Sequence, residues 1–157
     1  MKPSCCACAA ECCARKALIR SPVLNNFCSQ VATQEHTPRR ILVVDDDPLV
    51  CESIRRILQL DQHQVEIANS GHDALTAVQQ GKFDLIIVDY EMPGNKGDAI
   101  AAEIKTKAPQ QLIIMITGHT EALRLAGNYP LAVDQVITKP FDMQELREAV
   151  RKIVSKL

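Results

Sequence analysis

The sequence feature that most constrains the fold is a short apolar run that ends abruptly in a carboxylate. Leu85–Val88 consists of four aliphatic residues, Asp89 follows directly, and Pro93 and Gly94 then break the chain into a loop. A run of this length between turn signals predicts a strand that is buried on both faces. An Asp after such a strand lies at the carboxyl edge of the sheet, where open α/β folds bind ligands. We therefore predict that Asp89 is the working residue; the alternative is an Asp that only caps a loop or a following helix.

The same succession of strand and helix occurs five times in the globular part of the chain. We predict strands at residues 41–44, 65–68, 85–88, 112–116 and 133–138. We predict helices at residues 48–60, 70–80, 99–107 and 120–127, and a last helix capped by Asp142. Strands that alternate with helices through short connections predict an α/β fold: a doubly wound, five-stranded parallel sheet with five helices covering both faces.

Polar side chains follow four of the five predicted strands. They are Asp45-Asp46-Asp47, Asp89, Thr117 and Lys139. Each alone is typical of a solvated turn or a surface lysine, but the ends of parallel strands converge at one edge of a sheet. Clustered carboxylates raise one another's pKa unless a cation is present, and oxygen ligands suit Mg²⁺. A lysine and a threonine hydroxyl could hold phosphate beside the metal, and one carboxylate could act as a nucleophile toward phosphorus.

Four motifs identify a family that this chain resembles. Val43–Pro48, Val88–Gly94 with Gly97, Ile116–Gly118 and Thr138–Phe141 closely resemble the receiver domain of two-component response regulators. The resemblance covers residues 39–157 and has every motif in the expected order. It implies a flavodoxin-like sheet with the strand order 2-1-3-4-5.

The resemblance also implies how a metal ion is held. Mg²⁺ is expected to be bound directly by Asp46 and Asp89 and by the backbone carbonyl of Glu91. Asp45 is expected to act nearby through a water molecule. Asp47 is then expected to cap the following helix rather than to bind the metal.

The remaining residues of the motifs are implied to handle the phosphoryl group. Asp89 is the expected phosphoacceptor, and its donor is the phosphohistidine of a histidine kinase or of a histidine phosphotransfer protein. Thr117 is expected to hydrogen-bond the phosphoryl group and Lys139 to pair with it. The Lys139–Pro140 peptide bond is expected to be cis, as in the family.

The sequence departs from the family pattern at two places. Val136 occupies the position where the family often has an aromatic residue that turns inward, so a rotating aromatic switch is in doubt. Residues 131–134 lack the usual Ala-Gly-Ala run, so the surface of the fourth helix, fifth strand and fifth helix, a candidate homodimer face, could differ. Glu91 and His119 either tune the phosphate lifetime or are both solvated. His63 and the other histidines outside the motifs are predicted to be solvent or loop residues.

Residues 1–38 form a different kind of segment. Six of the seven cysteines lie there, as Cys5, Cys6, Cys8, Cys12, Cys13 and Cys28. This segment has neither helical periodicity nor alternation, and we interpret it as an unstructured leader; binding of a soft metal, redox sensing and lipidation are the alternatives. Only Cys51 lies in the globular part, which therefore lacks a disulfide framework and is predicted to be cytoplasmic.

Charge and hydropathy limit the function classes. Residues 1–38 have a net charge of +2 and residues 39–157 of −3, which does not favour direct binding of nucleic acid. No apolar run approaches the roughly 18 residues of a membrane helix. Because little sequence follows the last helix, we expect a stand-alone switch that acts on a downstream protein and is no enzyme beyond its own phosphorylation and dephosphorylation. The alternatives are a magnesium-dependent aspartyl-phosphate hydrolase and a dimerisation module that works without phosphate.

Overall fold

The five predicted strands form one parallel sheet. The computed structural model describes residues 37–94, 96–118 and 132–157. The sheet has the order β2-β1-β3-β4-β5, which confirms the predicted topology. Its strands are β1 (Arg40–Val44), β2 (Gln64–Ala68), β3 (Leu85–Asp89), β4 (Leu112–Thr117) and β5 (Gln135–Thr138).

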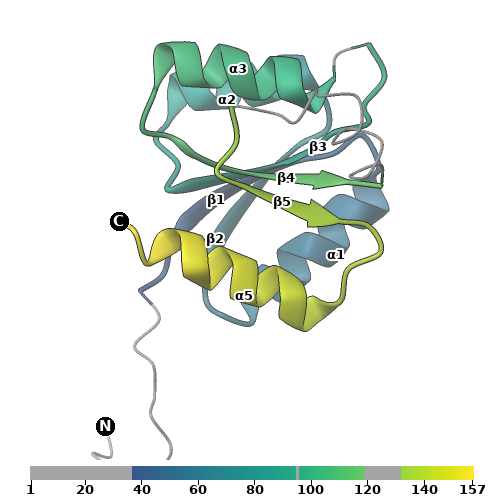
Figure 1. Cartoon of the computed structure of the whole chain (residues 1–157), viewed down its shortest axis with the longest axis vertical. Helices are drawn as coiled ribbons and strands as arrows, with labels where there is room; N and C mark the ends of the chain where they lie inside the picture. The colour runs from purple at the N-terminus through teal and green to yellow at the C-terminus, as the bar shows by residue number, and fades with distance from the viewer. Residues whose placement is uncertain (1–36, 95, 119–131) are drawn as a thin grey trace, which may run out of the picture. The chain divides into compact units, whose positions relative to one another are not determined.

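Helices cover both faces of this sheet (Figure 1). The described residues contain four of them: α1 (Pro48–Gln59), α2 (Gly71–Gln80), α3 (Gly97–Lys107) and α5 (Met143–Val154). Helices α2 and α3 lie over one face, and α1 and α5 lie over the other. The helix predicted at 120–127 and the residue His119 lie outside the described residues.

Polar side chains begin three of these helices. The carboxylate of Asp47 accepts a hydrogen bond from the N–H of Leu49 at 2.8 Å, which confirms Asp47 as a helix cap. Ser70 and Asp142 cap α2 and α5 in the same way. Each such cap satisfies a backbone donor that the helix cannot pair, and typically stabilises the fold by about 1 kcal/mol.

Strand β3 separates two aliphatic cores. All five of its residues are buried, as predicted for a strand covered on both faces. Leu85 and Ile87 pack toward α1 and α5, whereas Ile86 and Val88 pack toward α2 and α3. This alternation is the period of two that a strand imposes. Asp89 therefore ends the central and best-buried strand of the sheet.

Strand β5 begins two residues later than predicted because Asp134 has another role. Its carboxylate accepts a hydrogen bond from the N–H of Ile113 at 2.9 Å and pairs with Lys105 at 2.9 Å. The Asp134 N–H in turn donates to the Ile113 carbonyl at 2.9 Å. These bonds fix the residue before β5 against β4 and α3, in the segment where the family pattern is lost.

The prediction that His63 is a solvent or loop residue is right about the loop and wrong about the solvent. This residue lies in the connection before β2, but only 6% of it is exposed. Its Nδ1 accepts a hydrogen bond from the N–H of Arg39 at 3.2 Å. Arg39 is half-buried, and the imidazole supplies an acceptor for its backbone donor just before β1 begins.

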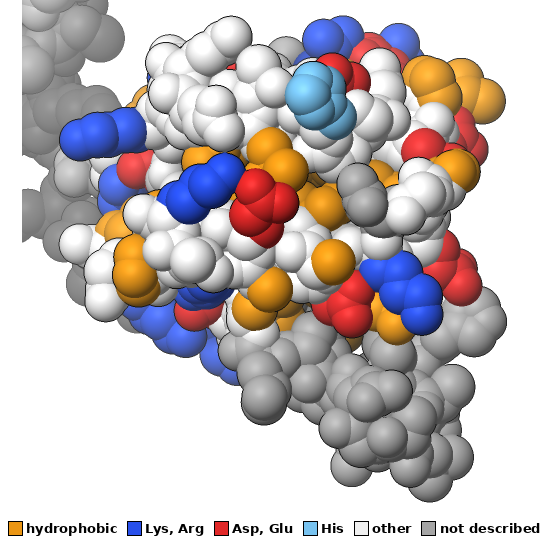
Figure 2. Space-filling view, turned by 90° about the horizontal axis from the view of Figure 1, so that it is seen from above, with side chains coloured by type: hydrophobic (Ala, Val, Ile, Leu, Met, Phe, Trp, Pro, Cys, Tyr) orange, Lys and Arg blue, Asp and Glu red, His pale blue; other side chains and the backbone are white. Residues whose placement is uncertain are grey.

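The surface over α2 and α3 carries mixed side chains. Figure 2 shows hydrophobic groups on this face interspersed with both basic and acidic ones. The visible described surface therefore has no extended basic area of the kind that binds nucleic acid. Among the described helices, none is long and apolar enough to cross a membrane.

Candidate functional site

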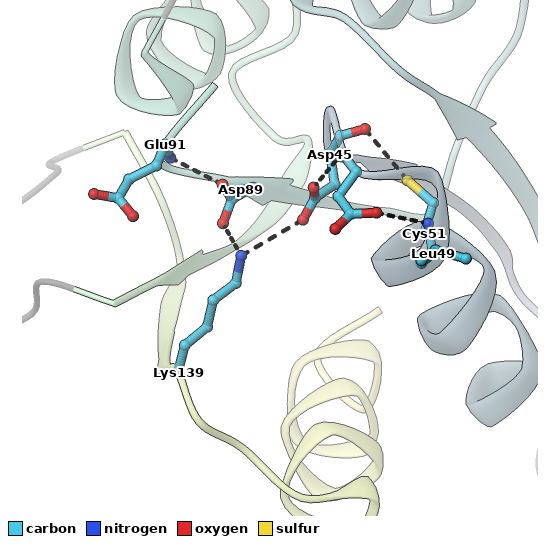
Figure 3. A network of polar contacts seen from close by, with 7 residues as sticks. Asp45, Leu49, Cys51, Asp89, Glu91 and Lys139 are labelled. Atoms are coloured by element: carbon cyan, nitrogen blue, oxygen red, sulfur yellow. Dashed lines mark hydrogen bonds and ion pairs between the residues drawn. The ribbon is translucent and has the colours of Figure 1, made fainter. Parts of the chain in front are cut away.

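Three carboxylates meet at the carboxyl edge of the sheet. Asp45 and Asp46 directly follow β1, and Asp89 ends the neighbouring strand β3. One oxygen from each lies within 4.8 Å of the others. Asp45 and Asp89 are 3% and 4% exposed, whereas Asp46 is open to solvent. We call these three residues together with Lys139 the acidic site; Figure 3 shows Asp45, Asp89 and Lys139 of this site.

Lys139 places a cation against both buried carboxylates. It follows β5 directly, and its Nζ lies 2.6 Å from Oδ1 of Asp89 and 3.6 Å from Oδ2 of Asp45. The Lys139–Pro140 peptide bond is cis, as the resemblance implied. A single ammonium group thus faces two buried negative charges.

The presence of one ammonium group beside two buried carboxylates affects the pKa values of Asp45 and Lys139. Burial raises the pKa of Asp45, and the negative charge of Asp89 raises it further. Burial alone would lower the pKa of Lys139, but the hydrogen bond and charge of Asp89, with the charge of Asp45, outweigh burial and raise it. Lys139 therefore stays protonated, while Asp45 lacks full compensation.

The Asp89 carboxylate is held at both oxygens. Oδ2 accepts a hydrogen bond from the backbone N–H of Glu91 at 3.0 Å, and Oδ1 faces Lys139. The bond to Glu91 is the turn contact that Asp commonly makes two residues along the chain. Oδ2 of Asp89 therefore has the loop-capping role considered as the alternative, whereas Oδ1 points to the ammonium group of Lys139.

Asp45 is oriented from the first turn of α1. Its Oδ1 accepts a hydrogen bond from the N–H of Asp47 at 2.9 Å, and its backbone carbonyl accepts one from the thiol of Cys51 at 3.4 Å. The sequence analysis assigned Cys51 no role at the site; its position in the first turn of a helix after Asp45 was the available signal. Burial, and then the charge of Asp45, raises the pKa of Cys51 to about 11. The thiol is therefore a donor and not a nucleophile at neutral pH.

The acidic site fits a magnesium ion. Oδ2 of Asp45 is buried and has no hydrogen-bond donor in the described part of the chain. The candidate ligands are all oxygen atoms at an open sheet edge, which is the ligand set that Mg²⁺ prefers. Asp45, Asp46 and Asp89 are the residues that would hold the ion. When bound, Mg²⁺ would supply positive charge to stabilise phosphoryl oxygens.

The other predicted residues lie around this edge. Thr117 ends β4 and is fully buried, and its carbonyl accepts a hydrogen bond from the N–H of Lys139 at 2.8 Å. Glu91 is exposed and its carboxylate lies near Gly118, where a built Cβ would be 3.9 Å from Oε2. Val136 is half-buried against the core under α2 and α3. Thr117 is thus brought to the site, and Val136 is part of the packing.

Comparison with known proteins gives one consistent result. A sequence model described as the response regulator receiver domain matches residues 41–151. The chain is 29% identical over 119 residues to response regulator MprA of Mycolicibacterium vanbaalenii, covering 76% of this chain and 52% of that protein. It is 30% identical over 117 residues to MprA of Mycobacterium leprae, covering 74% and 51%. The chain thus spans about half the length of these relatives.

Solved structures agree with the sequence relatives. Response regulator TrrA of Thermotoga maritima, in complex with Mg(2+)-BeF, is 36% identical with a TM-score of 0.68, covering 73% of this chain and 98% of that one. A CheY-like receiver domain protein of Methanospirillum hungatei is 27% identical with a TM-score of 0.68, covering 76% and 96%. The fold of this chain is therefore that of its structural neighbours.

Proposed function

Because the chain belongs to the response regulator receiver domain family, we propose that Asp89 accepts a phosphoryl group from a phosphohistidine. The donor is a histidine kinase or a histidine phosphotransfer protein of a two-component system. The observation that carries the proposal is the buried Asp89 carboxylate, fixed by the N–H of Glu91 and facing the Lys139 ammonium at 2.6 Å. A carboxylate held in one orientation beside a cation is suited to attack an anionic phosphoryl group.

The transfer itself exchanges one bond to phosphorus for another. A carboxylate oxygen of Asp89 attacks the phosphorus atom, and a P–O bond forms while the P–N bond to the donor imidazole breaks. The bonding electrons return to the imidazole nitrogen, and the donor leaves as neutral imidazole when its other ring nitrogen carries a proton. Lys139 pairs with the incoming phosphoryl oxygens, and the Thr117 hydroxyl hydrogen-bonds them once the group is in place.

The metal requirement is a second part of the proposal. Asp46 and Asp89, with the backbone carbonyl of Glu91, would hold the Mg²⁺ ion, and Asp45 would support it from nearby through a water molecule. The close approach of the three carboxylates supports this assignment, as does Oδ2 of Asp45, which has no hydrogen bond within the described residues and only the distant ammonium of Lys139 at 3.6 Å. The structure of TrrA, a relative in complex with Mg(2+)-BeF, supports it by similarity.

Signalling is proposed to proceed through other proteins. In this proposal the chain is a switch and not a metabolic enzyme, with at most its own phosphorylation and dephosphorylation as activities. Its output is binding to a downstream protein, in a stand-alone form, whereas the MprA relatives are about twice as long as the matched region. Immunoblotting of the natural protein tests the stand-alone form: a band near 17.3 kDa is expected, and a much larger one contradicts it.

The phosphoacceptor is tested by intact mass spectrometry after incubation with Mg²⁺ and a phosphorylated histidine phosphotransfer domain. Wild type is expected to gain about 80 Da, one phosphoryl group. Asp89→Asn is nearly isosteric and is expected to gain nothing. Asp84→Asn is the matched control, because Asp84 precedes β3 at the opposite edge, and it should be labelled like wild type.

The outcomes separate the competing functions. Labelling of Asp89→Asn would reject Asp89 as the acceptor. Steady turnover of an added phosphomonoester by wild type would favour the hydrolase. Absence of labelling, with the same dimerisation in wild type and Asp89→Asn, would favour a module that works without phosphate.

A further inference from the structure

The first residue of α3 lies against the main chain of the proposed phosphoacceptor. A Cβ built on Gly97 would be 2.1 Å from the carbonyl oxygen of Asp89 and 3.0 Å from both its carbonyl carbon and the Cα of Tyr90. Side-chain carbons do not approach backbone atoms so closely. Gly94, in the same connection, has a φ of 86° and open space around its built Cβ. Gly94 is therefore needed for its conformation, and Gly97 for its lack of a side chain.

The close contact of Gly97 with the main chain also joins the two ends of the loop that follows Asp89. The N–H of Gly97 donates a hydrogen bond to the carbonyl of Tyr90 at 3.0 Å. The Nζ of Lys96 lies 5.9 Å from the centre of the Tyr90 ring, within cation–π range. The two ends of the loop are thus joined at Tyr90.

One further hydrogen bond connects Tyr90 and its neighbour Glu91 to the carboxylate of Asp89. Tyr90 is followed by Glu91, whose N–H donates to Oδ2 of Asp89 at 3.0 Å (Figure 3). A Cβ at position 97 would force the Asp89–Tyr90 peptide and α3 apart by about 1.3 Å, because ordinary contact begins near 3.4 Å and the built distance is 2.1 Å. The N–H of Glu91 would move with that peptide, and the carboxylate of Asp89 would lose its alignment.

We propose that Gly97 is a positioning residue for Asp89. By allowing α3 to begin in contact with the Asp89 carbonyl, it holds Tyr90 and Glu91 where the Glu91 N–H fixes the Asp89 carboxylate toward Lys139. This inference rests on the proposed function of Asp89 as the phosphoacceptor. It adds a residue that contacts neither the metal nor the phosphoryl group.

The test compares Gly97→Ala with Ala101→Gly in the full chain. Ala101 is buried one turn further along α3, so its replacement weakens the same helix without adding an atom beside Asp89. Gly97→Ala is expected to lower the rate of phosphoryl uptake from acetyl phosphate by about 10- to 100-fold, and Ala101→Gly by no more than about two-fold. Equal rates in variants of equal stability would overturn the proposal.

A spectroscopic readout separates alignment from general loss of structure. In ¹H–¹⁵N spectra without metal, Gly97→Ala should shift the amide resonance of Glu91 strongly, whereas Ala101→Gly should leave it in place. An unshifted Glu91 amide in folded Gly97→Ala would contradict the proposal. If wild type takes up no phosphoryl group from acetyl phosphate or from a phosphorylated histidine phosphotransfer domain, the proposed function fails, while this amide still decides the positioning role.

A milder variant covers the case in which Gly97→Ala does not fold. Lys96→Met removes the cation over the Tyr90 ring and adds no steric conflict. It should lower phosphoryl uptake by about two- to three-fold, the effect of losing a weak exposed cation–π contact. A rate and a Glu91 amide identical to wild type would then count against control of Asp89 by this loop.

Discussion

Buried carboxylates lie at both edges of the sheet, and they are compensated differently. At the amino edge, Asp61 in the connection before β2 is buried and faces Arg147 of α5. Arg147 donates from Nε at 2.8 Å to one carboxylate oxygen and from Nη2 to the other. At the carboxyl edge, Asp45 and Asp89 share the one ammonium group of Lys139.

The difference separates a structural ion pair from a site that has room for a ligand. Both oxygens of Asp61 are paired, and the hydrogen bond to Asp61 raises the pKa of Arg147. Oδ2 of Asp45 has no donor within the described residues, and burial raises its pKa. The Asp61–Arg147 pair joins α5 to the connection before β2, whereas the acidic site retains negative charge that a cation would neutralise.

The largest expected change in the free energy of unfolding comes from breaking the Asp61–Arg147 pair. Arg147→Met should lower the free energy of unfolding by about 3 kcal/mol, because it leaves Asp61 buried without its cation. Urea denaturation measures this loss. The double variant Asp61→Asn, Arg147→Met should recover part of it. A loss below about 1 kcal/mol would mean that water compensates Asp61 and that the two edges are alike.

Neutralising the acidic site should act in the opposite direction. Without Mg²⁺, Asp45→Asn should raise the free energy of unfolding by about 1 kcal/mol at pH 7, since it removes one of two carboxylates that share Lys139. Asn keeps an oxygen for the N–H of Asp47. Asp61→Asn is the matched control and should destabilise the fold. Destabilisation by both substitutions would remove the distinction.

The effect of Asp45→Asn should depend on pH in a defined direction. The pKa of Asp45 is raised above its ordinary value of 3.8, so the folded state binds more protons than the unfolded state in that range. Wild-type stability should therefore fall as the pH rises from about 3.8 through the raised pKa. Denaturation in EDTA should show the advantage of Asp45→Asn growing through this window and reaching its full size above it. An advantage of the same size below pH 3.8 would exclude the carboxylate charge as its cause.

The smallest effect is expected at an exposed ion pair. Arg40 contacts Glu66 at 2.6 Å across β1 and β2, but the two side chains are 42% and 49% exposed. Glu66→Gln should change the free energy of unfolding by at most about 0.5 kcal/mol, because water solvates both partners. A loss comparable to that of Arg147→Met, in the same urea assay, would show that burial is not what distinguishes the pairs.

The sequence predicted the acidic site well because topology alone assembles it. In a parallel sheet every strand ends at the same edge, so Asp45, Asp89, Thr117 and Lys139 had to meet once the strands were recognised. The capping roles of Asp47 and Asp142 were equally local, since each side chain acts within three residues. The motif resemblance then supplied the strand order.

The features that the sequence analysis missed all depend on how elements pack together. Asp61 and Arg147 are 86 residues apart, and neither stands in a pattern that announces a buried pair. His63 is buried and accepts a hydrogen bond from the N–H of Arg39, which lies 24 residues earlier in the chain. Gly97 was recognised as part of a motif, but its approach to Asp89 depends on where α3 begins. Such contacts depend on three-dimensional packing and cannot be predicted from the periodicity of the sequence.

The most direct test of the contrast between the two edges is thermal unfolding of wild type at increasing Mg²⁺, with NaCl adjusted to constant ionic strength. The Tm is expected to rise steadily with the Mg²⁺ concentration. The free energy of unfolding should increase by about 2.7 kcal/mol when this concentration is one hundred times the dissociation constant of Mg²⁺. Asp61→Asn should start lower and show the same rise, whereas Asp89→Asn should lose most of it. A wild-type Tm that does not respond to Mg²⁺, or an equal response in Asp89→Asn, would contradict the claim that the acidic site is built to hold a cation.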